Sequence, residues 1–229
     1  MSDQADTATL RDPEPVEPEG PGDERAQALA EETLRRREAA LQHIRKFGDP
    51  VLKSRASEIT SFGPELRREA DRMVAIMRDA IGVGLAATQL GVMHRLLVFQ
   101  AGPDATPTAI ANPTLDWLSD EETIVEEGCL SLPRVAVDVE RPLFARVSGL
   151  DTTGAPLEIE ASGLEARVLQ HEIDHLDGVL MLDRAPRDQR KAALRALREG
   201  GEYSPSAEEP VDEDAEEPVD EDPAAAASS

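Results

Sequence analysis

The chain has 229 residues and a formal net charge of −23 at pH 7, a length that suits one compact domain with tails. The charge lies mostly at the two ends. Residues 1–35 hold ten acids against three bases and residues 201–229 hold eleven acids and no base, so the 165 residues between them carry only −5. This balance argues against general nucleic-acid binding, which needs lysine and arginine to displace phosphate counterions, and we expect no DNA partner.

The cellular compartment is indicated by what the sequence lacks. Its single cysteine, Cys129, excludes an internal disulfide framework and favours a reducing compartment. The N-terminus begins Met1-Ser2-Asp3-Gln4, without the basic and apolar regions of a signal peptide, and no apolar run has the length needed to cross a bilayer. We therefore expect a cytoplasmic protein without a membrane partner.

Both ends of the chain are predicted to lie outside the folded domain. Residues 1–35 form an acidic extension. We expect its first part, residues 1–24, to be disordered, and a long helix to begin near residue 27 and reach about residue 44. Residues 201–229 contain the acidic heptamer EEPVDED twice and are too polar to pack, which predicts a disordered tail. The folded domain then spans residues 36–200.

Within the domain, hydrophobic periodicity predicts helices at both ends and strands between them. The first helix begins at Pro64, where a first turn tolerates proline, and is closed by Gly82. Its apolar face comprises Leu66, Ala70, Met73, Val74, Met77 and Ile81. A period of two then predicts strands over residues 95–101, 108–118, 143–150 and 157–160.

A last core helix is predicted from Ser162 to about Gly178. Ser162 and Glu165 have the spacing of a capping box, which would start this helix. Strands between two main helices, without regular β-α-β alternation, predict an α+β fold. We expect antiparallel or mixed strands around this central helix, with a long N-terminal helix and a C-terminal helix.

The strongest chemical signal is the segment His171-Glu172-Ile173-Asp174-His175 on this last core helix. Residues four apart share one helical face, so both imidazoles can reach one divalent metal while Glu172 takes a proton from an activated water. The same pattern also suits two histidines on an ordinary amphipathic helix. A catalytic site needs a third ligand, and Cys129 is the candidate, although an isolated cysteine can equally be a small buried hydrophobe.

A third segment, residues 82–89, reads GVGLAATQ. Its two glycines allow the backbone to approach another group closely. A phosphate-binding loop is excluded because no Gly-Lys-Ser/Thr follows. By composition alone, the segment is an ordinary connection between a helix and a strand.

Together, three motifs carry a family resemblance. GVGLAATQ (82–89), EGCLS (127–131) and QHEIDHLDG (170–178), in this order and spacing, resemble the signature motifs of the peptide deformylases. The sequence GDPVL (48–52), Asn112-Pro113 and Arg141 also match. The resemblance covers about residues 41–199 and neither acidic tail. It implies hydrolytic removal of the N-formyl group from the formyl-Met of newly made polypeptides, with release of formate.

The resemblance also implies a role for individual residues. The metal ligands would be Cys129, His171 and His175, holding Fe²⁺, with Zn²⁺, Ni²⁺ or Co²⁺ as possible substitutes. The catalytic groups would be Glu172 as general acid/base, and the Gln89 amide and the Leu130 N–H as oxyanion donors. Substrate backbone would bind Gly84. From the motif and the helical phase, we expect the methionine pocket to be lined by Val83, Leu164 and Val168.

The C-terminal helix predicted over residues 187–198 has a basic face. This face comprises Arg187, Arg190, Lys191, Arg195 and Arg198, with alanines on the opposite side. It is either a solvated surface or an electrostatic contact with ribosomal RNA near the exit of the nascent chain, as the family's substrate implies.

Two other classes of protein remain as alternatives. A zinc peptidase would use the same histidines with a third ligand downstream, for which Glu199 or Glu202 is available. A non-catalytic metal-binding or ribosome-associated module would need neither Glu172 nor Gln89, and the presence of both argues against it.

Overall fold

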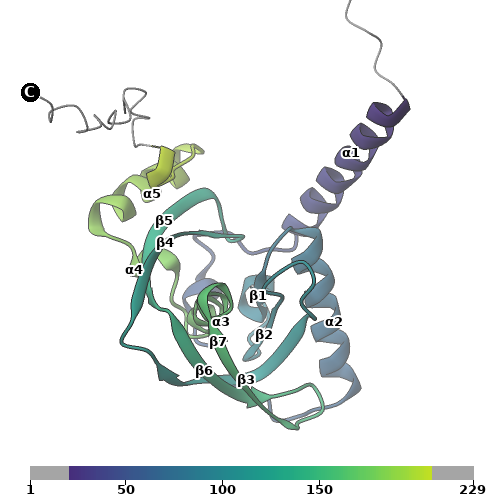
Figure 1. Ribbon diagram of the computed structural model, residues 1–229, viewed down its shortest axis with the longest axis vertical. Helices are drawn as coiled ribbons and strands as arrows, with labels where there is room; N and C mark the ends of the chain where they lie inside the picture. Colours follow the sequence, from purple (N-terminus) through teal and green to yellow (C-terminus); the bar gives the residue numbers. More distant parts are fainter. Residues whose placement is uncertain (1–20, 208–229) are drawn as a thin grey trace, which may run out of the picture.

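The computed structural model describes residues 21–207, and the disorder expected for residues 1–20 and 208–229 concerns parts of the chain outside this range. The fold is α+β, as predicted (Figure 1). A five-stranded antiparallel sheet has the strand order β1-β2-β3-β6-β7, and β4 and β5 form a separate two-stranded sheet. The strands are β1 (Gly84–Ala86), β2 (Leu96–Phe99), β3 (Thr108–Leu118), β4 (Glu122–Cys129), β5 (Leu132–Pro142), β6 (Phe144–Leu150) and β7 (Pro156–Ser162).

Helices surround and fill this framework. The α-helices are α1 (Pro21–Leu41), α2 (Pro64–Asp79), α3 (Gly163–Leu176), α4 (Met181–Arg184) and α5 (Arg187–Glu199). Short 3₁₀ helices are η1 (Pro50–Lys53), η2 (Ala87–Leu90) and η3 (Pro205–Ala207). Figure 1 shows α1 projecting from the body and α3 running through its centre, between the two sheets. No helix within residues 21–207 is both long and apolar enough to span a membrane.

The central position of α3 follows from its burial on nearly every side. Its apolar residues Ala166, Val168, Leu169, Ile173 and Leu176 pack into the core formed with the large sheet. The helix is followed, as predicted, by Gly178. This residue has a φ of +75°, and a Cβ added to it would lie 2.8 Å from the Lys53 backbone, so the position suits only glycine. The predicted capping box is not formed, because the Ser162 side chain makes no capping hydrogen bond.

The helix α2 begins at Pro64 as predicted but ends before Gly82. Leu66, Ala70, Met73 and Met77 are buried on its inner face. The chain turns out of the helix at Ile81, which has a φ of +59° and is 63% exposed. The prediction that Ile81 belongs to the buried helical face is therefore wrong, since this residue has already left the helix.

Both predicted boundaries of the folded domain also need correction. The helix α1 begins at Pro21, inside the extension expected to be disordered. At the other end, the chain remains ordered past Gly200: the Tyr203 N–H donates to the Arg134 carbonyl (3.0 Å) and the Ala136 N–H donates to the Tyr203 carbonyl (2.8 Å). These hydrogen bonds use backbone groups on the edge of β5 that faces away from β4. Tyr203 provides the partners that this edge would otherwise lack.

Candidate active site

Two elements bring the three predicted metal ligands together. Cys129 ends β4, whereas His171 and His175 lie one turn apart on α3. One ligand atom from each lies within 4.8 Å of the others, and the Cys129 Sγ is 3.2 Å from the His175 Nε2. This is the one such cluster among residues 21–207, and it includes neither Glu199 nor Glu202. The arrangement expected for a peptidase with a downstream acidic ligand is therefore not formed.

The donor set fits a divalent metal. Ligand atoms around a tetrahedral ion lie about 3–4 Å apart, and the Sγ–Nε2 separation of 3.2 Å falls in that range. Burial opposes ionisation of the Cys129 thiol, but the neighbouring His175 and His171 outweigh it and hold the pKa of the thiol well below its usual value. The thiolate is the form that binds metal, so this environment prepares the ligand.

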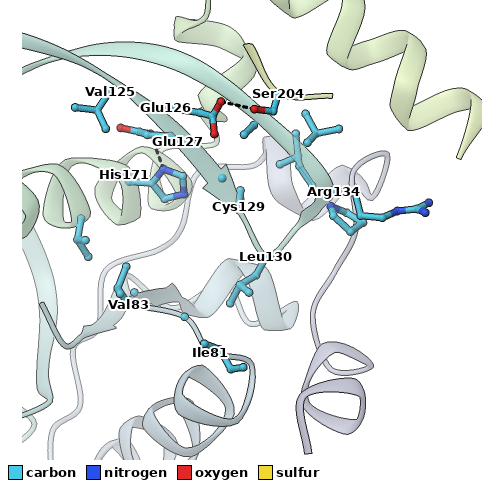
Figure 2. A pocket seen from close by; sticks show the side chains of 18 of the residues that line it. Ile81, Val83, Val125, Glu126, Glu127, Cys129, Leu130, Arg134, His171 and Ser204 are labelled. Carbon is cyan, nitrogen blue, oxygen red and sulfur yellow. Dashed lines mark hydrogen bonds and ion pairs between the residues drawn. The ribbon is translucent and has the colours of Figure 1, made fainter. Parts of the chain in front are cut away.

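A buried carboxylate orients the first histidine. Glu127, on β4, lies with Oε2 3.0 Å from the His171 Nδ1, which leaves the Nε2 of that ring for a metal (Figure 2). The same carboxylate accepts hydrogen bonds from Arg141 Nε (2.6 Å) and Arg167 Nη1 (2.7 Å). Burial alone would raise the pKa of Glu127, but His171 and Arg141 lower it well below its usual range.

This ionic cluster extends beyond the histidine. Arg141 also donates to Asp174 on α3 (2.8 Å), and Asp174 accepts from Arg184 on α4. Sequence reasoning identified Arg141 as a residue that matches the family but gave no role to Glu127 or Asp174. The available signal was that both acids lie inside motifs, one near the cysteine and one between the two histidines.

Glu172 is buried beside the ligands. Its side chain is only 4% exposed, and its Oε2 has no hydrogen-bond partner among the described residues. Burial raises its pKa above the usual value. The carboxylate also lies against Gly84, where an added Cβ would come within 2.8 Å of the Glu172 Cγ and Cδ. The close backbone approach expected of the glycine-rich segment is thus made, in part, to this acid.

Gln89 and Leu130 flank the cluster. The Gln89 Oε1 accepts a hydrogen bond from the Ala86 N–H (2.9 Å), which directs its Nε2 towards the Cys129 Sγ (3.6 Å) and the Ser131 Oγ (3.3 Å). The peptide group of Leu130 is held through its carbonyl, which accepts from the Lys46 Nζ (3.0 Å). The amide nitrogen of Gln89 therefore faces the cluster, and Leu130 directly follows Cys129 and lines the same groove.

A groove of about 880 Å³ opens over the cluster. It is lined by Gly84, Gln89, Cys129, Leu130, His171 and Glu172, and by the three residues predicted for the methionine pocket, Val83, Leu164 and Val168. Ile81 and Val125 line it as well and were not predicted; Figure 2 shows Ile81 and Val83 on the side opposite β4. Val83, Leu164 and Val125 are exposed apolar side chains, which gives the groove an apolar surface in need of a partner.

A thiolate, two imidazoles and a buried carboxylate at the base of an open groove define a metal-dependent hydrolase. Residues 41–191 match the family model described as polypeptide deformylase. The chain belongs to this family. Its activity is metal-dependent hydrolysis that removes the N-formyl group from nascent peptides, which sets aside both the peptidase and the non-catalytic alternative.

Individual relatives agree with this assignment. The chain is 45% identical over 160 residues to a peptide deformylase of a Parafrankia species, covering 70% of this chain and 87% of the relative. It is 46% identical over 160 residues to that of Acidothermus cellulolyticus, with the same coverage. Among solved structures, a peptide deformylase from Synechococcus elongatus superposes with a TM-score of 0.65 at 37% identity, covering 73% of this chain and 91% of the other.

Proposed function

We propose that the deformylase reaction takes place at Cys129, His171 and His175, in the cytoplasm, with Glu172 as general acid/base. The observation that carries this proposal is the buried Glu172 carboxylate, whose unpartnered Oε2 lies beside three side chains suited to one metal ion. A purely structural metal site would not need an orphaned acid in that place, because an unpaired buried polar atom is costly.

The proposed cofactor is Fe²⁺, with Zn²⁺, Ni²⁺ or Co²⁺ as substitutes. A soft thiolate with two imidazoles suits iron or zinc, and the family resemblance favours ferrous iron. When bound, such an ion polarises a carbonyl group and lowers the pKa of water.

Glu172 is proposed to move the proton. Its carboxylate accepts a proton from the attacking water as the water oxygen adds to the formyl carbon. It then delivers that proton to the methionine nitrogen as the carbon–nitrogen bond breaks, so that formate and a free amine leave. Burial raises the pKa of Glu172, which suits a group that must both accept and donate a proton near neutral pH.

Two donors are proposed to stabilise the negative charge that develops on the formyl oxygen. They are the Gln89 Nε2 and the backbone N–H of Leu130. The hydrogen bond from Ala86 to the Gln89 Oε1 supports this role, because it fixes which end of the amide faces the cluster. A donor of this kind typically contributes about 3 kcal/mol to transition-state stabilisation.

The substrate peptide is proposed to lie along β1. This strand forms one edge of the five-stranded sheet, so its outer backbone groups can pair with an extended peptide, beginning at Gly84. The methionine side chain would then contact the apolar surface formed by Val83, Leu164 and Val168.

One experiment tests these assignments together. Protein purified without oxygen is assayed for formate release from formyl-Met-Ala, and its bound metal is quantified. We expect about one iron per chain and formate release that stops on chelation and returns with Fe²⁺. Formate release by metal-free protein would contradict the proposed site.

The substrate is a nascent chain, which emerges from the ribosome, so the ribosome is a second proposed partner. All five basic residues of the predicted face are exposed on α5, whereas Ala193 and Ala196 are buried against the body. We propose that this face contacts ribosomal RNA near the tunnel exit, where Lys and Arg side chains gain from neutralising phosphates.

A further inference from the structure

The last ordered part of the chain, residues 202–207, is here called the C-terminal strap. Its first half extends the small sheet, since Tyr203 forms a parallel bridge with Val135 on the free side of β5. Arg134 supports the approach to the strap, because its Nη2 donates to the Gly200 carbonyl (2.5 Å). Thus β4, β5 and the strap lie side by side at this end of the molecule.

The second half of the strap is held by one carboxylate on β4. Glu126 accepts hydrogen bonds from the Ser204 Oγ (2.5 Å), the Ser206 Oγ (2.7 Å) and the Ser206 N–H (3.3 Å). Figure 2 shows the bond between Glu126 and Ser204 on the side of the groove opposite Ile81 and Val83. These bonds, Ser204 first, hold the pKa of Glu126 below its usual value, so the acceptor stays ionised at neutral pH.

The strap lines the groove that holds the metal ligands. Glu202, Tyr203, Ser204 and Ala207 are all part of the groove lining, together with Gly84, Cys129 and Glu172. The formyl group belongs at the metal cluster and the methionine side chain beside Val83, Leu164 and Val168. A nascent polypeptide continues beyond these groups, and the strap, with Arg134 and Ala136, forms lining that neither the formyl group nor the methionine uses.

We propose that the C-terminal strap is a specificity-determining wall of the groove, contacting the third and later residues of the nascent peptide, and that Glu126 positions it. The inference rests on the deformylase activity and extends it to the part of the substrate beyond formyl-Met. Glu126 is a positioning residue: it acts through the two serines and not on the reacting atoms.

Two truncations separate the strap from the acidic tail that follows it. One variant ends at Gly201 and lacks both; the other ends at Ala207 and lacks only the tail. For each, kcat and KM are measured with formyl-Met-Ala and with formyl-Met-Ala-Ala-Ala. The dipeptide reports the chemistry, and the ratio of the two kcat/KM values reports contacts made by the longer peptide.

We expect the tetrapeptide-to-dipeptide ratio to fall about fivefold in the chain ending at Gly201, through KM, as suits the loss of one or two weak contacts. The chain ending at Ala207 should keep the full-length ratio. An unchanged ratio in the Gly201 chain, or an equal fall in both chains, overturns the proposal. If the full-length protein itself does not hydrolyse the dipeptide, the result would instead count against the proposed deformylase activity.

A point substitution covers the case in which the shorter chain does not fold. Glu126→Ala removes the acceptor of both serines, and we expect it to lower the same ratio while leaving kcat on the dipeptide in place. Glu160→Ala is the matched control, because Glu160 is an exposed acid on β7 that pairs with Arg146 and lies outside the groove lining. A ratio that responds equally to both substitutions is evidence against a positioning role.

Photo-crosslinking provides a direct measurement. A formyl peptide with benzoylphenylalanine at its fourth residue is irradiated with Glu172→Ala protein, in which we expect it to bind while its turnover is slowed at least a hundredfold. Crosslinks to residues 202–207 support the strap as the contact. Crosslinks confined to other segments overturn it.

Discussion

At the scale of single residues, the proposed roles separate the groups that would hold a metal from the group that would move protons. Cys129→Ala removes a ligand atom, so we expect this variant to lose most of its bound metal. Glu172→Ala leaves all three ligands in place and should keep the metal while kcat falls about 10²- to 10⁴-fold. Metal analysis and formate release on the same preparations check both statements; substantial turnover by Glu172→Ala would show that another group carries the proton.

Gly84 is constrained by the same carboxylate. An alanine Cβ at this position would be 2.8 Å from the Glu172 Cγ and Cδ, closer than such contacts normally come, so either the backbone or the acid must move. We expect Gly84→Ala to lower kcat/KM at least tenfold, because small displacements of catalytic groups are costly, with metal content retained. Gly201→Ala is the control, since a Cβ there meets Ala196 atoms only at 3.9 Å. Equal activity in both variants would mean that Glu172 moves aside without consequence.

At the scale of elements, buried ion pairs join β4, β5, α3 and α4 behind the metal ligands. Glu127 accepts from His171, Arg141 and Arg167 at once, and all of these groups are largely buried. Removing the carboxylate leaves two buried guanidinium groups without this partner. We expect Glu127→Ala to lower the free energy of unfolding by about 3–5 kcal/mol and metal affinity by about 10- to 100-fold.

Denaturant unfolding and metal titration measure these two effects separately. Glu160→Ala, which removes an exposed acid from a surface pair, should change the free energy of unfolding by less than about 1 kcal/mol. A Glu127→Ala protein with normal metal affinity would show that His171 keeps its orientation without this hydrogen bond. A similar loss of stability in both variants would show that burial adds nothing to the ion pair.

The elements also show what could be predicted from the sequence. Local periodicity predicted β6 and the start of α2 closely, because each has one buried face, and it also gave the bounds of β3, although Ile110 and Ala111 are both buried there. The family resemblance predicted that Cys129, His171 and His175 come together, and the three side chains do form one cluster. The sheet of β4 and β5 was not predicted, although Val135, Val137 and Val139 alternate on β5, because most side chains of β4 are exposed and give no period of two. The strap was not predicted because Arg134 and Glu126, which hold it in place, are about 70–80 residues away in the sequence. The short polar segment itself has no hydrophobic pattern that would indicate an ordered structure.

At the scale of the whole molecule, a helix with a basic face is followed along the chain by a strongly acidic segment. The basic face of α5 is exposed, and ten of the eleven acids after Gly200 follow Ala207 directly. The earlier acid, Glu202, belongs to the strap and lines the groove, so a chain that ends at Ala207 keeps every lining residue among those the structure describes.

This order along the chain predicts that the acidic tail weakens the proposed binding to the ribosome. Its carboxylates compete with phosphates for the basic face, and the covalent tether raises their local concentration. Ending the chain at Ala207 should therefore increase co-sedimentation with ribosomes at low salt, with a smaller increase at high salt because ions screen both interactions. Turnover of formyl-Met-Ala should be unchanged, since the strap and the metal cluster are intact. A variant with Arg187, Arg190 and Arg195 changed to alanine should bind weakly with or without the tail; if it binds as well as the unmodified chain, α5 is not the contact.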